Sequence, residues 1–317
     1  MTIETGTWTL PHGKTLRWAA ATDIGLKRSE NQDSFLAAPP FFLVADGMGG
    51  HAGGKQASAT LLGHIQPLTG TDVSLRMVRE SLEAACEEVM GLVEANIDYT
   101  ISPPGTTLTG LVVLGSLRDD ANSQDTEHNR ADEPETAQFL VLNVGDSRTY
   151  VLREGLLTRL TRDHSQVAEM VEAGMLTVEE ARVWPTRSVI TRAIGAGQIG
   201  LPQIDTWTYP VAAPRRLLVC SDGLHSMIDD GAIGRALGDN PTPETAVNSL
   251  VNLALQAGGH DNVTAIVVDV TASESAPTES ADSTQPEPPA PPTQSEPPAS
   301  PDSLLPPPPP PDSEGQP

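Results

Sequence analysis

Three β-rich segments of the chain end in an aspartate that is followed by a typical turn residue. The three pairs are Asp46-Gly47, Asp146-Ser147 and Asp222-Gly223. Taken singly, each pair has an ordinary explanation, because Asp bonds its own backbone in tight turns. A turn alone, however, does not require the glycine-rich run and His51 that follow the first aspartate. Carboxylate and backbone oxygens are the ligands that hard divalent cations prefer, so a metal site is the second explanation.

Two more aspartates lie beside strand-like segments. Asp33 precedes the run Ser-Phe-Leu at 34–36, and Asp261 opens the last β-rich segment. Arg28 stands five positions before Asp33. By itself this arginine has a plain interpretation as a surface residue beside Lys27. A common site would explain all of these residues together.

The strands that must position these residues are short. Seven β-rich runs, bounded mostly by Gly, Asp, Asn or Pro, cover residues 16–22, 41–45, 108–117, 139–144, 149–152, 216–220 and 263–270. The third, fourth and fifth runs follow one another without a helical pattern between them. We therefore expect an antiparallel meander, and an α+β fold with helices outside the sheets.

Three segments carry helix signals. Apolar residues spaced by three and four predict an amphipathic helix over residues 74–92. Thr242 before Pro243 predicts the start of a second helix, since Thr caps a helix and Pro suits its first position. Thr177 followed by Glu180 forms a capping box for a short third helix.

The composition excludes several function classes. The 317 residues include 19 Lys and Arg against 42 Asp and Glu, and a formal charge of -23 argues against a nucleic-acid partner. No apolar run reaches the length of a membrane helix, so we expect no membrane partner. Only two cysteines occur, Cys86 and Cys220, which predicts no disulfide framework and favours a cytoplasmic location.

The chain divides into a body and two flanking segments. We expect an N-terminal extension over residues 1–14, a globular body over 15–270 and a disordered tail over 271–317. The tail holds 16 of the 29 prolines and eight acidic residues, with almost nothing to bury. Its six prolines at 306–311 fit either a spacer or a docking site for a partner domain. An acidic stretch at 118–137 is expected to be an inserted solvent loop.

Eight short motifs follow one another between residues 23 and 264. They are DIG at 23–25 with RSENQD at 28–33, VADGMGGH at 44–51, GTT at 105–107, VGDSR at 144–148, LTRDHS at 160–165, TRAIG at 191–195, CSDG at 220–223 and GHDNVT at 259–264. In this order they resemble the metal-dependent protein phosphatases of type 2C, the PPM family, in their compact bacterial Ser/Thr form. The resemblance covers nearly all of residues 18–270.

The resemblance implies a fold and a metal centre. The fold is two antiparallel β-sheets packed as a sandwich and flanked by α-helices on both sides, in α-β-β-α layers. The centre holds two Mn²⁺ or Mg²⁺ ions and a weaker third ion. By position, Asp46 bridges the first two ions and the carbonyl of Gly47 binds one of them. Asp222 and Asp261 complete the shell of the first ion, and Asp146 joins Asp222 at the third.

The resemblance also implies roles for three residues around the ions. Asp33 acts near the second ion, directly or through water. Arg28 clamps the phosphate, because a guanidinium is a planar fork of donors that stays charged. His51 is a candidate general acid for the leaving serine or threonine oxygen. The alternative is a structural histidine, because in other branches the acid directly follows the Asp-Gly pair, where this chain has Met48.

Elementary electrostatics agrees with this assignment if the aspartates converge. Two unpaired carboxylates about 5 Å apart repel by about 3 kcal/mol at an effective dielectric constant near 20. A cluster of four or five therefore needs cations. Two divalent ions close together also activate a shared water for in-line attack on phosphorus, so no covalent phosphoenzyme is required.

The implied function is hydrolysis of phosphoserine and phosphothreonine in proteins, which would counteract a bacterial Ser/Thr kinase. The alternative is a non-catalytic regulator with the same fold that binds phosphoproteins. Residues 165–195 resemble the family's mobile flap beside the site. Three positions depart from the family pattern. Gln32 stands where many members have an acidic residue, and Ser226-Met227 follow His225 where a threonine and an acid are frequent.

Overall fold

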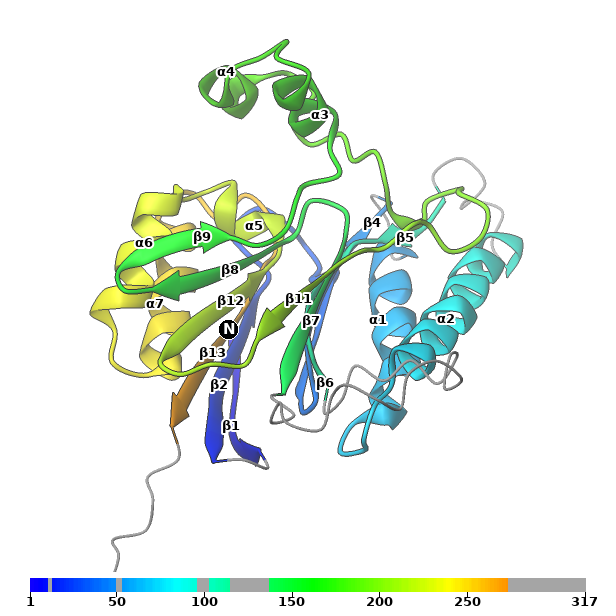
Figure 1. Cartoon of the computed structure of the whole chain (residues 1–317). Coiled ribbons are helices and arrows are strands. Elements are labelled where there is room, and N and C mark those ends of the chain that lie inside the picture. The colour runs from blue at the N-terminus through cyan, green and yellow to red at the C-terminus, as the bar shows by residue number, and fades with distance from the viewer. Residues whose placement is uncertain (11–12, 50–52, 96–102, 115–136, 273–317) are drawn as a thin grey trace, which may run out of the picture. The chain divides into compact units, whose positions relative to one another are not determined.

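Two antiparallel sheets form the centre of the molecule (Figure 1). The computed structural model describes residues 1–10, 13–49, 53–95, 103–114 and 137–272. Sheet one has the order β1 (Thr2–Leu10), β2 (Lys14–Asp23), β13 (Val263–Ala272), β12 (Arg215–Cys220), β8 (Arg148–Arg153) and β9 (Leu156–Arg159). Sheet two has the order β10 (Ile194–Gly195), β5 (Gly105–Thr106), β4 (Phe41–Met48), β6 (Leu108–Leu114), β7 (Gln138–Val144) and β11 (Asp205–Pro210), and β3 (Asp33–Ala38) pairs with β4.

Helices cover both outer faces of this sandwich (Figure 1). Against sheet two lie α1 (Gly53–Ile65), the short 3₁₀ turn η1 (Gln66–Leu68) and α2 (Leu75–Ala95). Against sheet one lie α5 (Asp222–His225), α6 (Asp230–Asp239) and α7 (Pro243–Gln256). Two small helices, α3 (Gln166–Glu172) and α4 (Val178–Val183), belong to the flap. The predicted α-β-β-α sandwich is confirmed.

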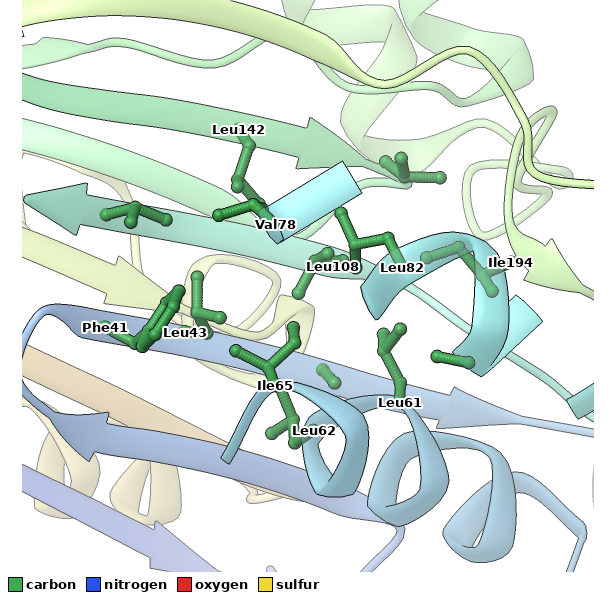
Figure 2. Close-up of a cluster of buried hydrophobic side chains, with 14 of the residues drawn as sticks. Phe41, Leu43, Leu61, Leu62, Ile65, Val78, Leu82, Leu108, Leu142 and Ile194 are labelled. Atoms are coloured by element: carbon green, nitrogen blue, oxygen red, sulfur yellow. The ribbon is translucent and has the colours of Figure 1, made fainter. Parts of the chain in front are cut away.

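Buried side chains fill each of the three interfaces between layers. Figure 2 shows the cluster between α1, α2 and sheet two, where Leu61 and Leu82 from the helices meet Phe41 and Leu108 from the strands. A second cluster lies between the two sheets, and a third between sheet one and helices α5 to α7. Burial on both faces explains why the central strands are apolar throughout rather than alternating.

The sequence signals place helix starts correctly. Thr177 and Glu180 form the predicted capping box at the start of α4, with the Thr177 N–H donating to Glu180 Oε2 at 2.8 Å. At the start of α7, Thr242 Oγ1 accepts a hydrogen bond from the N–H of Thr245, and Pro243 follows as the first residue of the helix. Each cap satisfies donors that the first helical turn leaves without a partner.

Two features differ from the sequence-based expectations. Residues 2–10, set apart above as an N-terminal extension, form β1 and pair along their whole length with β2. Gly6 makes room there for the ring of Trp18, a contact that no local pattern announces. The expected meander is also split, because β6 and β7 pair in sheet two whereas β8 lies in sheet one. The Gly145-Asp146 turn carries the chain from one sheet to the other.

Some expectations lie outside the described residues. These are the acidic insert up to residue 136, the tail from residue 273 onward, and His51. The first two residues of the expected tail, Thr271 and Ala272, still belong to β13. Within the described ranges, every helix is too short or too polar to cross a lipid bilayer.

Candidate active site

Asp33 and Asp46 face each other across β3 and β4. They are direct partners in the antiparallel register. The Asp46 N–H donates to Thr107 Oγ1 at 3.0 Å, and the Asp46 carbonyl accepts the Thr107 N–H at 2.9 Å. Because both backbone groups of Asp46 point toward Thr107, its pairing with Asp33 is of the non-hydrogen-bonded kind, in which the side chains are close together.

Asp222 and Asp261 come from neighbouring strands of sheet one. Asp222 follows the last residue of β12 and Asp261 precedes the first residues of β13. Because these two strands pair antiparallel, both aspartates lie at the same end of sheet one. Gly223 packs so closely on the Asn262 carbonyl that a Cβ atom would not fit. Gly25 is packed in the same way on the Asp261 carbonyl, with φ +79°. These glycines allow the backbone segments around the two aspartates to approach each other.

A hydrogen bond joins the two pairs across the sandwich. Ser221 Oγ donates to Asp33 Oδ2 at 2.8 Å, which links the end of β12 to β3. The charges of Asp222 and Asp261 also act on the Asp46 carboxylate, which indicates that these side chains lie near one another. Asp33, Asp46, Asp222 and Asp261, proposed above from separate motifs, therefore gather at one end of the molecule.

Asn262 fixes the loop that carries Arg28 against this cluster. Its side-chain amide donates to the carbonyls of Ile24 at 2.9 Å and Glu30 at 3.0 Å. Its Oδ1 accepts the N–H of Gln32 at 2.9 Å. In the sequence Asn262 is only one residue of the GHDNVT motif, and nothing in its spacing identifies these partners.

The cluster places several carboxyl groups close together in a buried part of the molecule. Burial raises the pKa of Asp33 to about 7 and that of Asp222 to about 6, and the charges of neighbouring aspartates add to both effects. Burial, followed by the charges of the other carboxylates, also raises the pKa values of Asp46 and Asp146 well above their usual range. Each of these carboxylates therefore pays an electrostatic penalty when ionised, which a bound cation would remove.

Asp146 completes the set from the turn between the two sheets. It is 7% exposed, and the charge of Asp222 contributes to its raised pKa. Among the side chains that the structure describes, Asp146 Oδ1 and Asp33 Oδ1 are buried oxygens without a hydrogen-bond partner. Buried oxygens of this kind are normally satisfied, so the two mark positions suited to a cation.

Arg28 lies at the rim of the cluster. Its Nη2 donates to Asp261 Oδ2 at 2.7 Å, and the side chain is half exposed. The hydrogen bond to Asp261 raises the pKa of Arg28, and the charges of Asp222 and Asp46 act in the same direction. The predicted phosphate ligand thus lies beside the predicted metal ligands, and the sequence did not indicate that it would pair with one of them.

The oxygen donors fit Mg²⁺ or Mn²⁺. All of the side chains are carboxylates, the ligand type that these ions prefer over thiolate or imidazole. Gly47 lies on β4 next to Asp46, packed against the carbonyl of Gly54 where a side chain would not fit. In the part of the chain that the structure describes, no group of three or more His, Cys, Asp or Glu side chains is arranged closely enough to hold a metal ion as it stands.

The flap stands above this end of the sandwich (Figure 1). It begins and ends where Ser165 and Ile190 form an isolated antiparallel bridge. Neither α3 nor α4 contains a buried residue. Val183 is 79% exposed and Trp184 is 36% exposed, so apolar side chains of the flap remain available for contact.

Known proteins resemble the chain over most of its body. No protein-family model matches it. The serine/threonine protein phosphatase PstP of Mycobacterium tuberculosis is 34% identical over 267 residues, which are 83% of this chain and 47% of PstP. The chain thus corresponds to about half the length of that relative. The protein phosphatase PhpP of Streptococcus pneumoniae is 32% identical over 263 residues, which are 80% of this chain and 97% of PhpP.

A solved structure agrees with these sequence matches. The catalytic domain of PstP in complex with two manganese ions superimposes with a TM-score of 0.66 at 32% identity. The match covers 81% of this chain and 99% of that domain. Sequence, fold and the clustered aspartates lead to one conclusion: the chain belongs to the PPM family of metal-dependent serine/threonine protein phosphatases.

Proposed function

We propose that the chain hydrolyses phosphoserine and phosphothreonine in proteins with the help of Mn²⁺ or Mg²⁺. The carrying observation is the convergence of the aspartates from both sheets, with two buried carboxylate oxygens that have no partner among the described residues. Asp33, Asp46, Asp222 and Asp261, with the Gly47 carbonyl, would hold two ions. Asp146 and Asp222 would hold a weaker third ion.

When bound, such ions acidify an attacking water and neutralise charge on the phosphoryl group. The protein's part is to hold the carboxylates in place and ionised. Thr107 fixes the backbone of Asp46, and Ser221 orients Asp33 by donating to Oδ2. Since both bonds involve strand ends of the sandwich, the site is built on its rigid part.

Arg28 would bind the substrate's phosphoryl group. A guanidinium has five N–H donors, so the bond to Asp261 leaves capacity for a fork to phosphoryl oxygens. The half-exposed position of Arg28 suits a group that must meet substrate from solvent. His51 stays a candidate general acid, with a structural histidine as the alternative.

The substrate class and cellular context are also part of the proposal. The relatives' names PstP and PhpP denote protein phosphatases, which supports phosphoproteins as substrates. A phosphoprotein requires a kinase that forms it, so an opposing Ser/Thr kinase is included. Both cysteines, Cys86 and Cys220, are free, which supports a reducing compartment such as the cytoplasm. Docking of a partner by the proline-rich tail stays a prediction.

The decisive experiment measures release of phosphate from a phosphothreonine peptide. Turnover is expected with Mn²⁺ or Mg²⁺ and should stop when a chelator is added. The same rate in metal-free buffer would refute the mechanism. Tight peptide binding without turnover in the presence of metal would favour the non-catalytic regulator instead.

A further inference from the structure

The turn that carries Asp146 crosses from sheet two to sheet one between β7 and β8. Gly145 adopts φ +103°, and a Cβ atom there would collide with Thr107. The neighbouring Ser147 Oγ lies 2.9 Å from Thr107 Oγ1, so the turn is packed against the residue that also fixes Asp46. The backbone on both sides of Asp146 is therefore held by packing and hydrogen bonds, whereas Asp146 Oδ1 has no partner among the described residues.

Two histidines hold the backbone of this turn. The backbone N–H of Gly145 donates to the ring nitrogen Nδ1 of His164 at 3.0 Å, and the backbone N–H of His164 donates to the Gly145 carbonyl at 2.9 Å. On α5, His225 Nε2 lies 3.0 Å from the carbonyl oxygen of Asp146. A carbonyl only accepts hydrogen bonds, so this ring nitrogen carries the proton and donates it.

His225 also belongs to the helix that presents Asp222. The two residues are three positions apart on α5, which places them on neighbouring positions of one helical face. Ser226 N–H bonds to the Asp222 carbonyl at 2.8 Å, so this short helix is closed around both residues. The bond from His225 to the Asp146 carbonyl therefore ties the backbone of one aspartate to the helix of the other.

We propose that His225 is a positioning residue that sets the separation of the Asp146 and Asp222 carboxylates, and thereby the affinity for the weaker ion that they share. This role rests on the proposed metal site. His225 directly precedes Ser226-Met227, where the chain departs from the family pattern, and the proposal gives this histidine a function. Hydrogen-bonding partners of metal-ligand residues commonly change metal affinity by 10–100-fold, so the effect is measurable.

The test counts bound Mn²⁺ by electron paramagnetic resonance of the free ion, in full-length wild type and three variants. His225→Phe keeps the ring volume and removes the donor. His225→Gln places an amide N–H near the position of Nε2. Leu237→Ala is the structural control, because Leu237 is buried in the same outer core but lies on α6, not on α5 or on the turn that carries Asp146.

His225→Phe is expected to raise the dissociation constant of the weakest Mn²⁺ about tenfold and to leave the tighter ions unchanged. His225→Gln should restore binding to within about threefold of wild type. Leu237→Ala should lower the melting temperature without changing Mn²⁺ affinity. If His225→Phe does not fold, His225→Asn carries the same test, since its shorter amide falls short of the carbonyl.

Three outcomes would overturn the proposal. They are wild-type Mn²⁺ binding in His225→Phe, failure of His225→Gln to restore binding, and an equal loss of affinity in Leu237→Ala. Wild-type protein that binds no Mn²⁺ would refute the metal site itself, and the role of His225 with it. Wild-type protein that binds Mn²⁺ while the His225 variants bind it equally well would refute only the role of His225.

Discussion

Replacing Asp46 by Asn should abolish metal-dependent turnover and, at the same time, stabilise the metal-free protein. Asp46 and Asp33 are direct cross-strand partners, which places their Cβ atoms about 5 Å apart. Two ionised carboxylates at about that distance repel by about 3 kcal/mol at an effective dielectric constant near 20. Asn has nearly the same shape as Asp but carries no charge, so the substitution removes the repulsion by Asp33. At a pH where both carboxylates are ionised in the folded state, the free energy of unfolding should therefore rise by up to about 3 kcal/mol.

Calorimetric melting of protein freed of metal by a chelator measures this difference. For a domain of this size, about 1 kcal/mol corresponds to a change of about 2–4 °C, so the full effect would raise the melting temperature of the variant about 6–12 °C above that of wild type. Added Mn²⁺ should then raise the melting temperature of wild type strongly and that of the variant little. Phosphopeptide hydrolysis by the variant should fall by orders of magnitude.

Asp229→Asn is the matched control for the Asp46 variant. Asp229 caps α6 by accepting the Ala232 N–H at 2.7 Å, and Asn caps helices as well as Asp does. This control should keep the melting temperature, the Mn²⁺ response and the activity of wild type. The reasoning fails if metal-free Asp46→Asn is less stable than wild type, or if Mn²⁺ stabilises it as much as wild type.

Three other measurements test separate parts of the site. In metal-free protein, burial raises the pKa of Asp33 to about 7, so the folded state binds a proton that the unfolded state has lost above about pH 4. The contribution of Asp33 to the free energy of unfolding must then fall as the pH rises from about 4 to 7. In urea unfolding at a series of pH values, the free energy of unfolding of wild type should fall relative to that of Asp33→Asn as the pH rises from about 4 to 7. A rise relative to the variant would contradict this expectation. Arg28→Lys keeps the charge but loses the donor fork, so KM for a phosphothreonine peptide should rise about tenfold, whereas Lys27→Ala should leave KM unchanged. Removal of residues 273–317 should change peptide hydrolysis by less than about twofold, and a larger loss would assign the tail to the catalytic unit.

The parts of the fold that the sequence predicts well are those set by local rules. The capping box at Thr177 and the cap at Thr242 depend on residues within one helical turn, and both form as expected. The aspartates at strand ends could be found for the same reason, because each lies where an apolar run stops. β1 escaped prediction because its pairing depends on Gly6 accommodating Trp18 of the next strand, and its own residues are mostly polar and exposed.

The site is harder to predict because its bonds are distant in sequence. Ser221 reaches Asp33 across 188 positions, and Arg28 reaches Asp261 across 233 positions. Such contacts depend on which strand ends meet, and that is decided by the order of strands in both sheets. The family resemblance supplied the expected partners of Asp46, whereas the bond from His225 to Asp146 follows only from the folded structure.

The same arrangement that makes the site useful makes the metal-free protein less stable. Asp33 and Asp222 keep raised pKa values because burial and neighbouring carboxylates oppose their ionisation. An ion that binds only the folded state stabilises it by RT ln(1 + [ion]/Kd), which at a hundredfold excess over Kd is about 2.7 kcal/mol. That gain is comparable to the repulsion of about 3 kcal/mol between one pair of carboxylates. Two ions would therefore offset the main electrostatic cost, and any variant that weakens one ion should gain less thermal stability from added Mn²⁺ than wild type does.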